Sequence, residues 1–199
     1  METHPISNGM DSRWITAVVA VIILALGAVY FLRSPQTPST VTPTPDRALK
    51  TFYNQKYGIA FNYPDSYEVK ETDATGEGTP RHSIVLADKA ALASVPAESE
   101  GPPAITLDIF PNAQNQSPEV WIKGSNFSNF KLSPDGQISA TAIAGEEGMA
   151  YGWDGLYRSN SIVINHKKQI YMFSVGYTTP DDLLIKDFAG IIASVQFDP

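Results

Sequence analysis

The sequence predicts an α+β domain, built on an antiparallel sheet of six or seven strands and joined to one N-terminal transmembrane helix. Three observations predict this arrangement. An uncharged apolar run covers residues 14–32. Several segments after residue 57 alternate apolar and polar residues, which is the pattern of strands with one buried face. Two proline-containing helix starts, at Ser117 and Thr179, lie in the second half of the chain.

The apolar run begins at Trp14 and ends at Leu32, and 11 of its 19 residues are Val, Ile, Leu or Phe. A helix of this length covers roughly 28 Å at about 1.5 Å per residue, which matches the hydrocarbon layer of a bilayer. A cleaved signal peptide is the alternative, but its apolar region is only about 7 to 15 residues long and ends at a small-residue cleavage site. We therefore predict an uncleaved, single-pass signal anchor.

The anchor divides the chain into a short tail (1–13), the transmembrane anchor (14–32), a Ser/Thr/Pro-rich linker (33–46) and a folded domain (47–199). The linker has four prolines and six hydroxyl residues between Ser34 and Pro45, a composition that favours an extended spacer. Arg13 and Arg33 balance across the anchor, so basic residues do not fix its direction. The short tail, the spacer and the absence of cysteine together favour a domain outside the cytoplasm, held at the cell membrane.

The charge of the folded domain excludes one class of partner. The chain has 14 basic and 21 acidic residues. Removing Arg13, Arg33, Glu2 and Asp11 leaves 12 basic and 19 acidic residues in segment 46–199, a net charge of −7. We expect no nucleic acid partner, because such proteins carry basic surfaces. The absence of cysteine also excludes disulfides, thiolate catalysis and cysteine-ligated metals.

Short segments rich in β-branched and aromatic residues predict the strands. The first ends at Pro64, and the segment 66–71 reads as its return strand. The last two form the clearest hairpin, with His166 in an exposed turn between them, and consecutive hairpins indicate an antiparallel sheet. The predicted strands are YGIAFNYP (57–64), SYEVKE (66–71), HSIVLAD (82–88), AITLDIF (104–110), QISATAIAG (137–145), LYRSNSIVIN (156–165) and QIYMFSVGY (169–177).

Helix-capping residues predict two helices. Ser117, Pro118 and Glu119 start a short helix through Trp121. The sequence TPDD from Thr179 repeats this arrangement before a longer helix. The apolar residues of the longer helix recur at helical spacing and predict that one face packs on the sheet: Leu184, Phe188, Ile191 and Val195, with Ile192 at the edge.

The two ends of the domain resemble the PsbP-like (Mog1/PsbP) family. The resemblance rests on the first strand, Y-G-[apolar]-x-[apolar]-x-Y-P at 57–64, and on the ending YMF (171–173), helix, IASVQF (192–197). It implies an α/β/α sandwich, in proteins that mostly serve as binding or assembly modules. Plant members assist photosystem II and are associated with calcium or manganese. No metal-binding residue of theirs matches a position here, and fold alone does not imply function.

Catalytic signatures are sparse. A serine hydrolase needs a positioned Ser, a base and a carboxylate, but the sequence has no G-x-S-x-G motif. The leading hypothesis is therefore a module without catalytic activity and with no catalytic residue. The alternative is an extracytoplasmic hydrolase that uses dispersed carboxylates or His82. A cleft that joins His82 to Asp or Glu would favour the alternative.

Two acidic segments leave calcium open as a ligand, although no cofactor is expected. Neither segment has the spacing of a known calcium loop, so solvated acidic turns are the preferred interpretation. The acidic residues are Glu71, Asp73 and Glu77 in the first segment, and Glu146, Glu147 and Asp154 in the second.

An unusual glycine-rich and aromatic segment covers residues 145–157. Its four large side chains are candidates for a recognition surface, because aromatic residues and Met are enriched at interfaces: Met149, Tyr151, Trp153 and Tyr157. The alternation of the first three equally fits the buried face of a strand. The predicted partners are the membrane, through residues 14–32, and another protein of the cell envelope.

Overall fold

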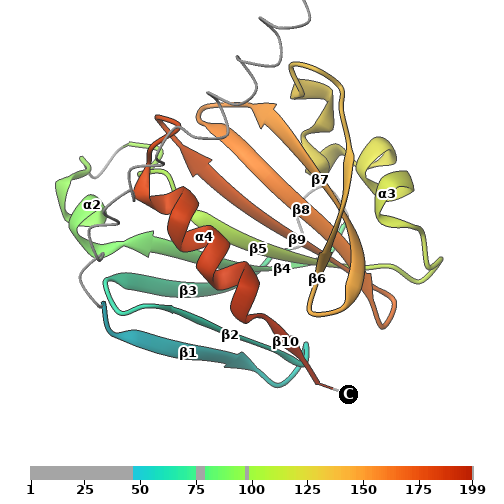
Figure 1. Cartoon of the computed structure of the whole chain (residues 1–199), viewed down its shortest axis with the longest axis horizontal. Helices are drawn as coiled ribbons and strands as arrows, with labels where there is room; N and C mark the ends of the chain where they lie inside the picture. Colours follow the sequence, from blue (N-terminus) through green and yellow to red (C-terminus); the bar gives the residue numbers. More distant parts are fainter. Residues whose placement is uncertain (1–46, 75–78, 97–98, 199) are drawn as a thin grey trace, which may run out of the picture. The chain divides into compact units, whose positions relative to one another are not determined.

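The structure is a computed structural model that describes residues 47–74, 79–96 and 99–198. These residues form an α+β domain with two antiparallel sheets (Figure 1). In chain order the elements are β1 (Leu49–Asn54), β2 (Ile59–Pro64), β3 (Tyr67–Ala74), β4 (Arg81–Asp88), α2 (Lys89–Ser94), β5 (Ile105–Pro111), α3 (Pro118–Gly124), the 3-10 turns η2 (Asn126–Ser128) and η3 (Phe130–Leu132), β6 (Ser139–Ile143), β7 (Glu146–Asp154), β8 (Arg158–His166), β9 (Gln169–Tyr177), α4 (Leu183–Ser194) and β10 (Gln196–Phe197).

The larger sheet has seven strands in the order β3-β4-β5-β9-β8-β7-β6, and every neighbouring pair is antiparallel. The prediction of an antiparallel sheet of six or seven strands is confirmed for this sheet. The central strand β9 is buried along most of its length, because both faces of the sheet are covered there.

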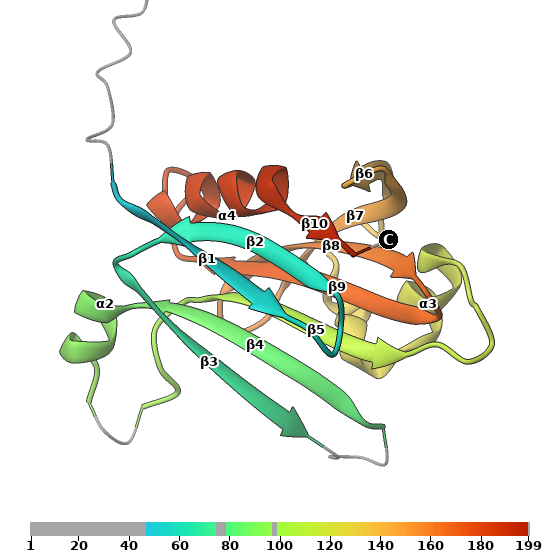
Figure 2. The same cartoon turned by 90° about the horizontal axis from the view of Figure 1, so that it is seen from below.

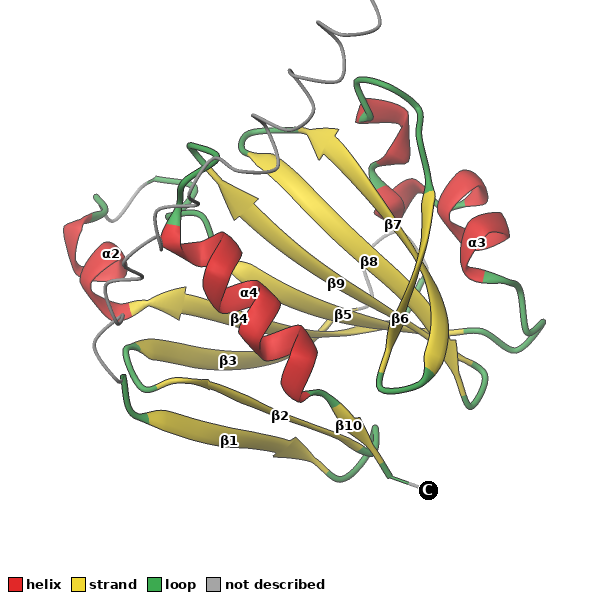
Figure 3. Ribbon diagram, viewed as in Figure 1, coloured by secondary structure: helices red, strands yellow, loops and turns green. Residues whose placement is uncertain are grey.

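A smaller sheet, in the order β1-β2-β10, lies with α4 over one face of the larger sheet (Figure 2). The main core fills the space between these layers, with Ile59 and Phe61 from β2 and Phe188 from α4 among its members. A second apolar cluster lies on the opposite face and includes Trp121 and Ile122 of α3. Figure 3 shows α3 on the side of the sheet away from α4. Helices therefore flank both faces of the larger sheet.

The prediction that segment 66–71 is the return strand of the first hairpin is wrong. β2 pairs with β1 and β10, whereas β3 pairs with β4 in the other sheet. The chain changes sheets after Pro64, and the apolar residues Phe61 of β2 and Tyr67 of β3 then meet in the core between the layers. β1 lies outside the predicted strands, and the described residues contain ten strands in all.

The two predicted helices are present. α3 begins at Pro118 and has Ser117 as its N-cap, as predicted. α4 starts later than predicted, because Asp182 rather than Thr179 accepts the hydrogen bond from the helix N-terminus. The predicted face of α4 packs on the core: Phe188, Ile191 and Val195 are buried, and Leu184 and Ile192 are partly buried.

The predicted tail (1–13), anchor (14–32) and linker (33–46) lie outside the described residues. Among the helices of the described part of the chain, none is both long and apolar enough to cross a bilayer. The membrane anchor therefore stays a prediction from sequence.

A charge pair ties the start of the domain to α4. The guanidinium group of Arg47 pairs with the carboxylate of Asp187, and the Tyr67 hydroxyl donates a hydrogen bond of 2.7 Å to the second oxygen of that carboxylate. Asp187 is buried. Burial, together with the hydrogen bond to Asp187, raises the pKa of Tyr67. A buried carboxylate is costly unless it is paired and hydrogen-bonded, so Asp187 depends on both partners.

We expect Asp187→Ala to lower the free energy of unfolding by roughly 2 to 4 kcal/mol, because it leaves Arg47 and Tyr67 without their acceptor. Urea denaturation of the full chain, followed by circular dichroism, measures the change. The control is Lys186→Ala at the neighbouring exposed position, where we expect a change within about 0.5 kcal/mol. Equal effects of the two substitutions would contradict the role of the pair.

Candidate functional site

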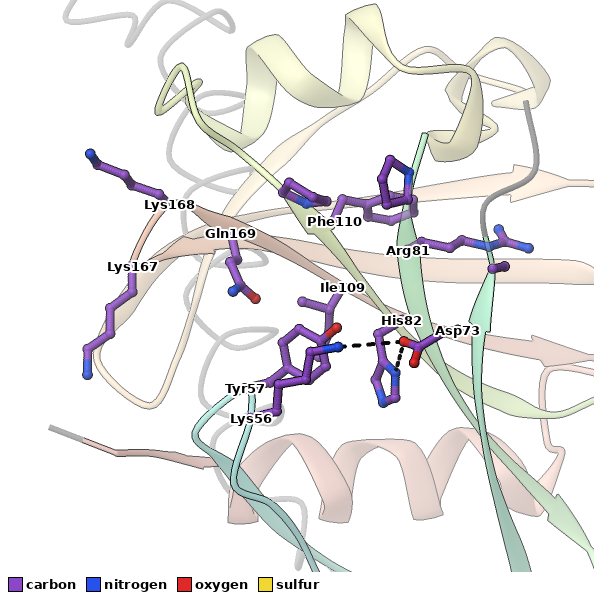
Figure 4. A pocket seen from close by; sticks show the side chains of 13 residues that line it. Lys56, Tyr57, Asp73, Arg81, His82, Ile109, Phe110, Lys167, Lys168 and Gln169 are labelled. Atoms are coloured by element: carbon purple, nitrogen blue, oxygen red, sulfur yellow. Dashed lines mark hydrogen bonds and ion pairs between the residues drawn. The ribbon is translucent and has the colours of Figure 1, made fainter. Parts of the chain in front are cut away.

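A cavity of about 420 Å³ lies at one end of the larger sheet. The β1–β2 turn, the ends of β3 and β5, the start of β4 and the β8–β9 turn form its walls (Figure 4). Four cationic side chains and one carboxylate line it: Lys56, Arg81, Lys167, Lys168 and Asp73. The sign of this cluster is opposite to the net charge of the domain, so the cavity is a local basic site on an acidic protein.

The β1–β2 turn brings Lys56 and Tyr57 to the cavity. The side chain of Asn54 accepts a hydrogen bond from the Tyr57 backbone N–H at 3.2 Å, and Gly58 closes the turn with a φ of +58°, where glycine is favoured. The Lys56 ammonium lies 4.8 Å from the centre of the Tyr57 ring. A hydrogen bond to the Tyr57 side chain raises the pKa of Lys56. Lys56 therefore keeps its charge at neutral pH.

The opposite wall is apolar and carries Arg81 at its edge. Ile109 and Phe110, at the end of β5, are almost completely buried and line the cavity. The Arg81 guanidinium lies 5.3 Å from the centre of the Phe127 ring, a distance typical of a cation–π contact. Figure 4 shows Arg81 and the lysines of the β8–β9 turn on different sides of the cavity, with the apolar residues between them.

His82 is held between two carboxylates. Its Nδ1 lies 2.8 Å from Asp73 and its Nε2 lies 3.0 Å from Glu71. Tyr57 stacks on the imidazole ring, with ring centres 4.7 Å apart. The hydrogen bond from His82, helped by the charge of Lys56, lowers the pKa of Asp73. His82 thus joins the ends of β3 and β4 and supports Tyr57.

The arrangement meets the condition that favours a hydrolase, because His82 and Asp73 both line the cavity. Its chemistry argues against this reaction. Both ring nitrogens of His82 lie within hydrogen-bond distance of a carboxylate oxygen, so a substrate or water would have to displace Asp73 or Glu71 to reach either of them. In the described part of the chain, no Ser, Thr or Cys side chain lines the cavity.

The β8–β9 turn places two lysines in an unfavourable backbone conformation. Lys167 and Lys168 form the two-residue turn between His166 and Gln169, with φ values of +47° and +60°. Turns with two positive φ values strongly prefer Asn-Gly, and each ordinary residue costs about 1 to 2 kcal/mol there. Strain of this kind gathers at functional sites. Here it places both lysines at the rim of the cavity, where the Lys167 ammonium donates a hydrogen bond to the backbone carbonyl of Asp198 at 3.0 Å.

We expect Lys168→Gly to raise the free energy of unfolding by about 1 kcal/mol, because glycine adopts the positive φ without strain. Thermal unfolding of the full chain provides the measurement. Lys70→Gly is the control, since Lys70 is exposed within β3 and glycine destabilises strand interiors. A loss of stability in Lys168→Gly would show that the turn is not strained.

Gln169, the first residue of β9, lines this cavity and also an adjoining hollow of about 280 Å³. Its Oε1 is buried and has no hydrogen-bond partner among the described residues. An unsatisfied buried acceptor costs about 1 to 3 kcal/mol.

The sequence analysis missed Gln169 and the four cations of the cavity. The available signal was the pair of lysines in a two-residue hairpin turn, where Asn-Gly is expected.

The prediction that His166 lies in an exposed turn is wrong. His166 is the last residue of β8, and only 12% of its side chain is exposed. Its ring stacks on Phe197 of β10 with centres 4.5 Å apart, and its Nδ1 lies 2.8 Å from Glu146. Because the turn has only two residues, His166 remains part of β8 and pairs with Gln169, and β10 covers its ring.

The four predicted recognition residues lie away from the cavity. Met149, Tyr151 and Trp153 are on β7 and pack in or against the smaller core cluster. Tyr151 is only 5% exposed. Tyr157 follows β7 and donates a hydrogen bond to the backbone of Gly101 at 2.8 Å. Met149, Tyr151 and Trp153 therefore lie on a buried face of β7. A binding role for the four residues stays a prediction.

The acidic segments are mostly engaged with other side chains. Glu71 and Asp73 bind His82, Glu146 binds His166, and Asp154 pairs with Arg158. Glu147 is exposed, and Glu77 lies outside the described residues. The described ranges contain no group of three or more His, Cys, Asp or Glu side chains that could hold a metal ion. Calcium binding stays an open possibility from sequence.

Comparisons with known proteins show the fold. No protein-family model and no curated protein matches the chain. Among solved structures, the chain is similar to cyanobacterial PsbP (CyanoP) from Synechocystis sp. PCC 6803, with a TM-score of 0.52 and 13% sequence identity. The match covers 78% of this chain and 96% of CyanoP. The expected PsbP-like fold is confirmed, and at this identity the likeness carries no function.

Proposed function

We propose that the chain is a membrane-tethered binding or assembly module, which acts outside the cytoplasm without catalysis and binds a small anionic ligand in the cavity at the β8–β9 turn. The single observation that carries this proposal is the cluster of four cationic side chains that line the cavity in a chain of net charge −7. Like charges gathered in a concave site attract an anion, which offsets their mutual repulsion.

The side chains of the cavity favour binding over chemistry. Lys56 keeps its charge through its contact with Tyr57, and Asp73 is engaged by His82 and by Lys56 at 3.8 Å. A bound anion therefore meets cations, an apolar wall and a carboxylate that is already paired. A hydrolase is the weaker candidate, because both ring nitrogens of His82 are engaged.

Inorganic pyrophosphate tests the anion site. We expect it to bind the full-length chain in isothermal titration calorimetry, with an affinity that Lys168→Gln or Arg81→Gln lowers by about tenfold, the usual effect of losing a hydrogen bond to a charged group. Lys131→Gln is the matched control, because it removes the same charge from an exposed residue outside the cavity. Equal losses in all three variants would contradict the proposed site.

A mixture of pyrophosphate and the full-length chain also tests the alternative function, a hydrolase. Release of orthophosphate by the wild type, but not by His82→Gln, would establish that activity and refute a purely binding role.

The tether rests on the apolar run at residues 14–32, which has the length and composition of a membrane span. We expect the full-length chain to stay in the membrane pellet after a carbonate wash, and a chain lacking residues 14–32 to appear in the supernatant. Immunoblotting of both fractions measures the distribution. Full-length chain in the supernatant would refute the tether.

A further inference from the structure

Strand β6 forms one edge of the larger sheet and leaves its outer side open to a further strand. Within the described residues it pairs with β7 alone, and its residues Ser139, Ala140 and Ala142 are exposed. Figure 2 shows β6 on the opposite side of the domain from β3, the other edge of this sheet. An edge strand carries unpaired N–H and C=O groups, to which a strand of another chain can bind.

The β6–β7 turn identifies which backbone groups are open. Ala144 and Gly145 form a two-residue turn with φ values of +51° and +87°. In a hairpin of this type the residues that flank the turn exchange both backbone hydrogen bonds, and the pattern then alternates along the strands. Ile143 and every second residue before it therefore bond to β7. The N–H and C=O groups of Ala140 and Ala142 point outward.

This edge lacks the features that keep other edges from pairing. Natural sheets protect an exposed edge with charged side chains, proline or a very short strand. Four of the eight residues of β3 are charged, β1 carries Lys50, and β10 has only two residues. By contrast, segment 136–145 (GQISATAIAG) contains neither a charged residue nor a proline. Among the edge strands that the structure describes, β6 is therefore the one suited to pairing.

We propose that β6 pairs antiparallel with β6 of a second copy of this chain, so that two larger sheets join into one. The two-fold axis passes through Thr141. In this register Ala140 of one copy lies opposite Ala142 of the other, and the outward N–H and C=O groups of these residues exchange hydrogen bonds. The interface is separate from the cavity and does not depend on the anion site.

The side chains across this axis suit a copy of the same strand. Ala140 and Ala142 are small, and Thr141 faces Thr141, a cross-strand pair that stabilises antiparallel sheets. Because the segment is uncharged, pairing places no like charges opposite one another. The two chains, each of net charge −7, repel at longer range, but salt screens this repulsion beyond about 8 Å. A two-fold contact uses the β6 edge of both copies, so the assembly stops at a dimer.

Opposite charges at Thr141 test the pairing. We expect the full-length chain in detergent micelles to form a dimer in sedimentation velocity. Thr141→Lys and Thr141→Glu each place two like charges across the axis, and we expect each to weaken self-association by about tenfold or more. An equal mixture of the two variants brings opposite charges together, and we expect it to form dimers again. Circular dichroism confirms that both variants are folded.

Thr72→Lys is the matched control, because Thr72 is exposed on β3 at the other edge of the sheet. We expect it to leave the dimer unchanged. A wild type that stays monomeric at every concentration overturns the proposal, as does a dimer that persists unchanged in both Thr141 variants. Failure of the mixed variants to associate also overturns it, because residues that face each other across the axis must restore the contact.

A cysteine cross-link tests the register. The chain has no cysteine, so Thr141→Cys introduces one thiol per copy, and the two thiols face each other across the axis. Cα atoms of such facing residues lie about 4.5 Å apart, within the range that a disulfide bridges.

The comparison variant is Ala140→Cys, whose Cα atoms lie roughly 8 Å apart in this register. We expect diamide to oxidise Thr141→Cys to a covalent dimer at least about tenfold faster than Ala140→Cys, because only the nearer pair has disulfide geometry. Non-reducing electrophoresis measures both rates. Equal rates, or faster cross-linking of Ala140→Cys, would overturn the pairing about Thr141.

Discussion

Burial of Ile59 and Phe61 against the larger sheet is the contact on which the candidate site depends. Both side chains are almost fully enclosed, and their burial holds the small sheet over one face of the large one (Figure 2). The β1–β2 turn consequently lies beside the ends of β4, β5 and β9. Tyr57 then stacks on His82 and Lys56 reaches the cavity. The apolar packing of β2 against the larger sheet thus positions the polar side chains of the cavity at the edge of the sheets.

Two unfavourable local features, a strained backbone and an unpaired buried oxygen, occur together at this edge of the sheet. Lys167 and Lys168 adopt a conformation that favours Asn or glycine, and the next residue, Gln169, buries an unpaired oxygen. The β6–β7 turn has the same form with Ala144 and Gly145, so only its first position carries a residue that disfavours a positive φ, whereas both positions of the β8–β9 turn do. Sequences that depart from local preference usually do so where function requires it. The departure here supports the β8–β9 turn as the functional end of the domain.

Residue patterns predicted the elements of the fold better than their pairing. Phe188 and Ile191 identified the buried face of α4, because helical spacing is a local signal. The pairing of β3 was mispredicted, since nothing local to Pro64 indicates that the chain changes sheets. The candidate site was harder still. Lys56, Arg81 and Gln169 lie in segments far apart in the chain, and only the sheet order and register bring them together.

The basic cavity on an acidic domain has a consequence for which anions reach it. Electrostatic influence in salt solution falls off over about 8 Å. A short anion inside the cavity lies within that range of its lysines and is shielded from most of the carboxylates of the domain. A long polyanion must also pass over the carboxylates outside, which repel it. The anion site proposed here therefore favours compact anions over polymers of the same charge density.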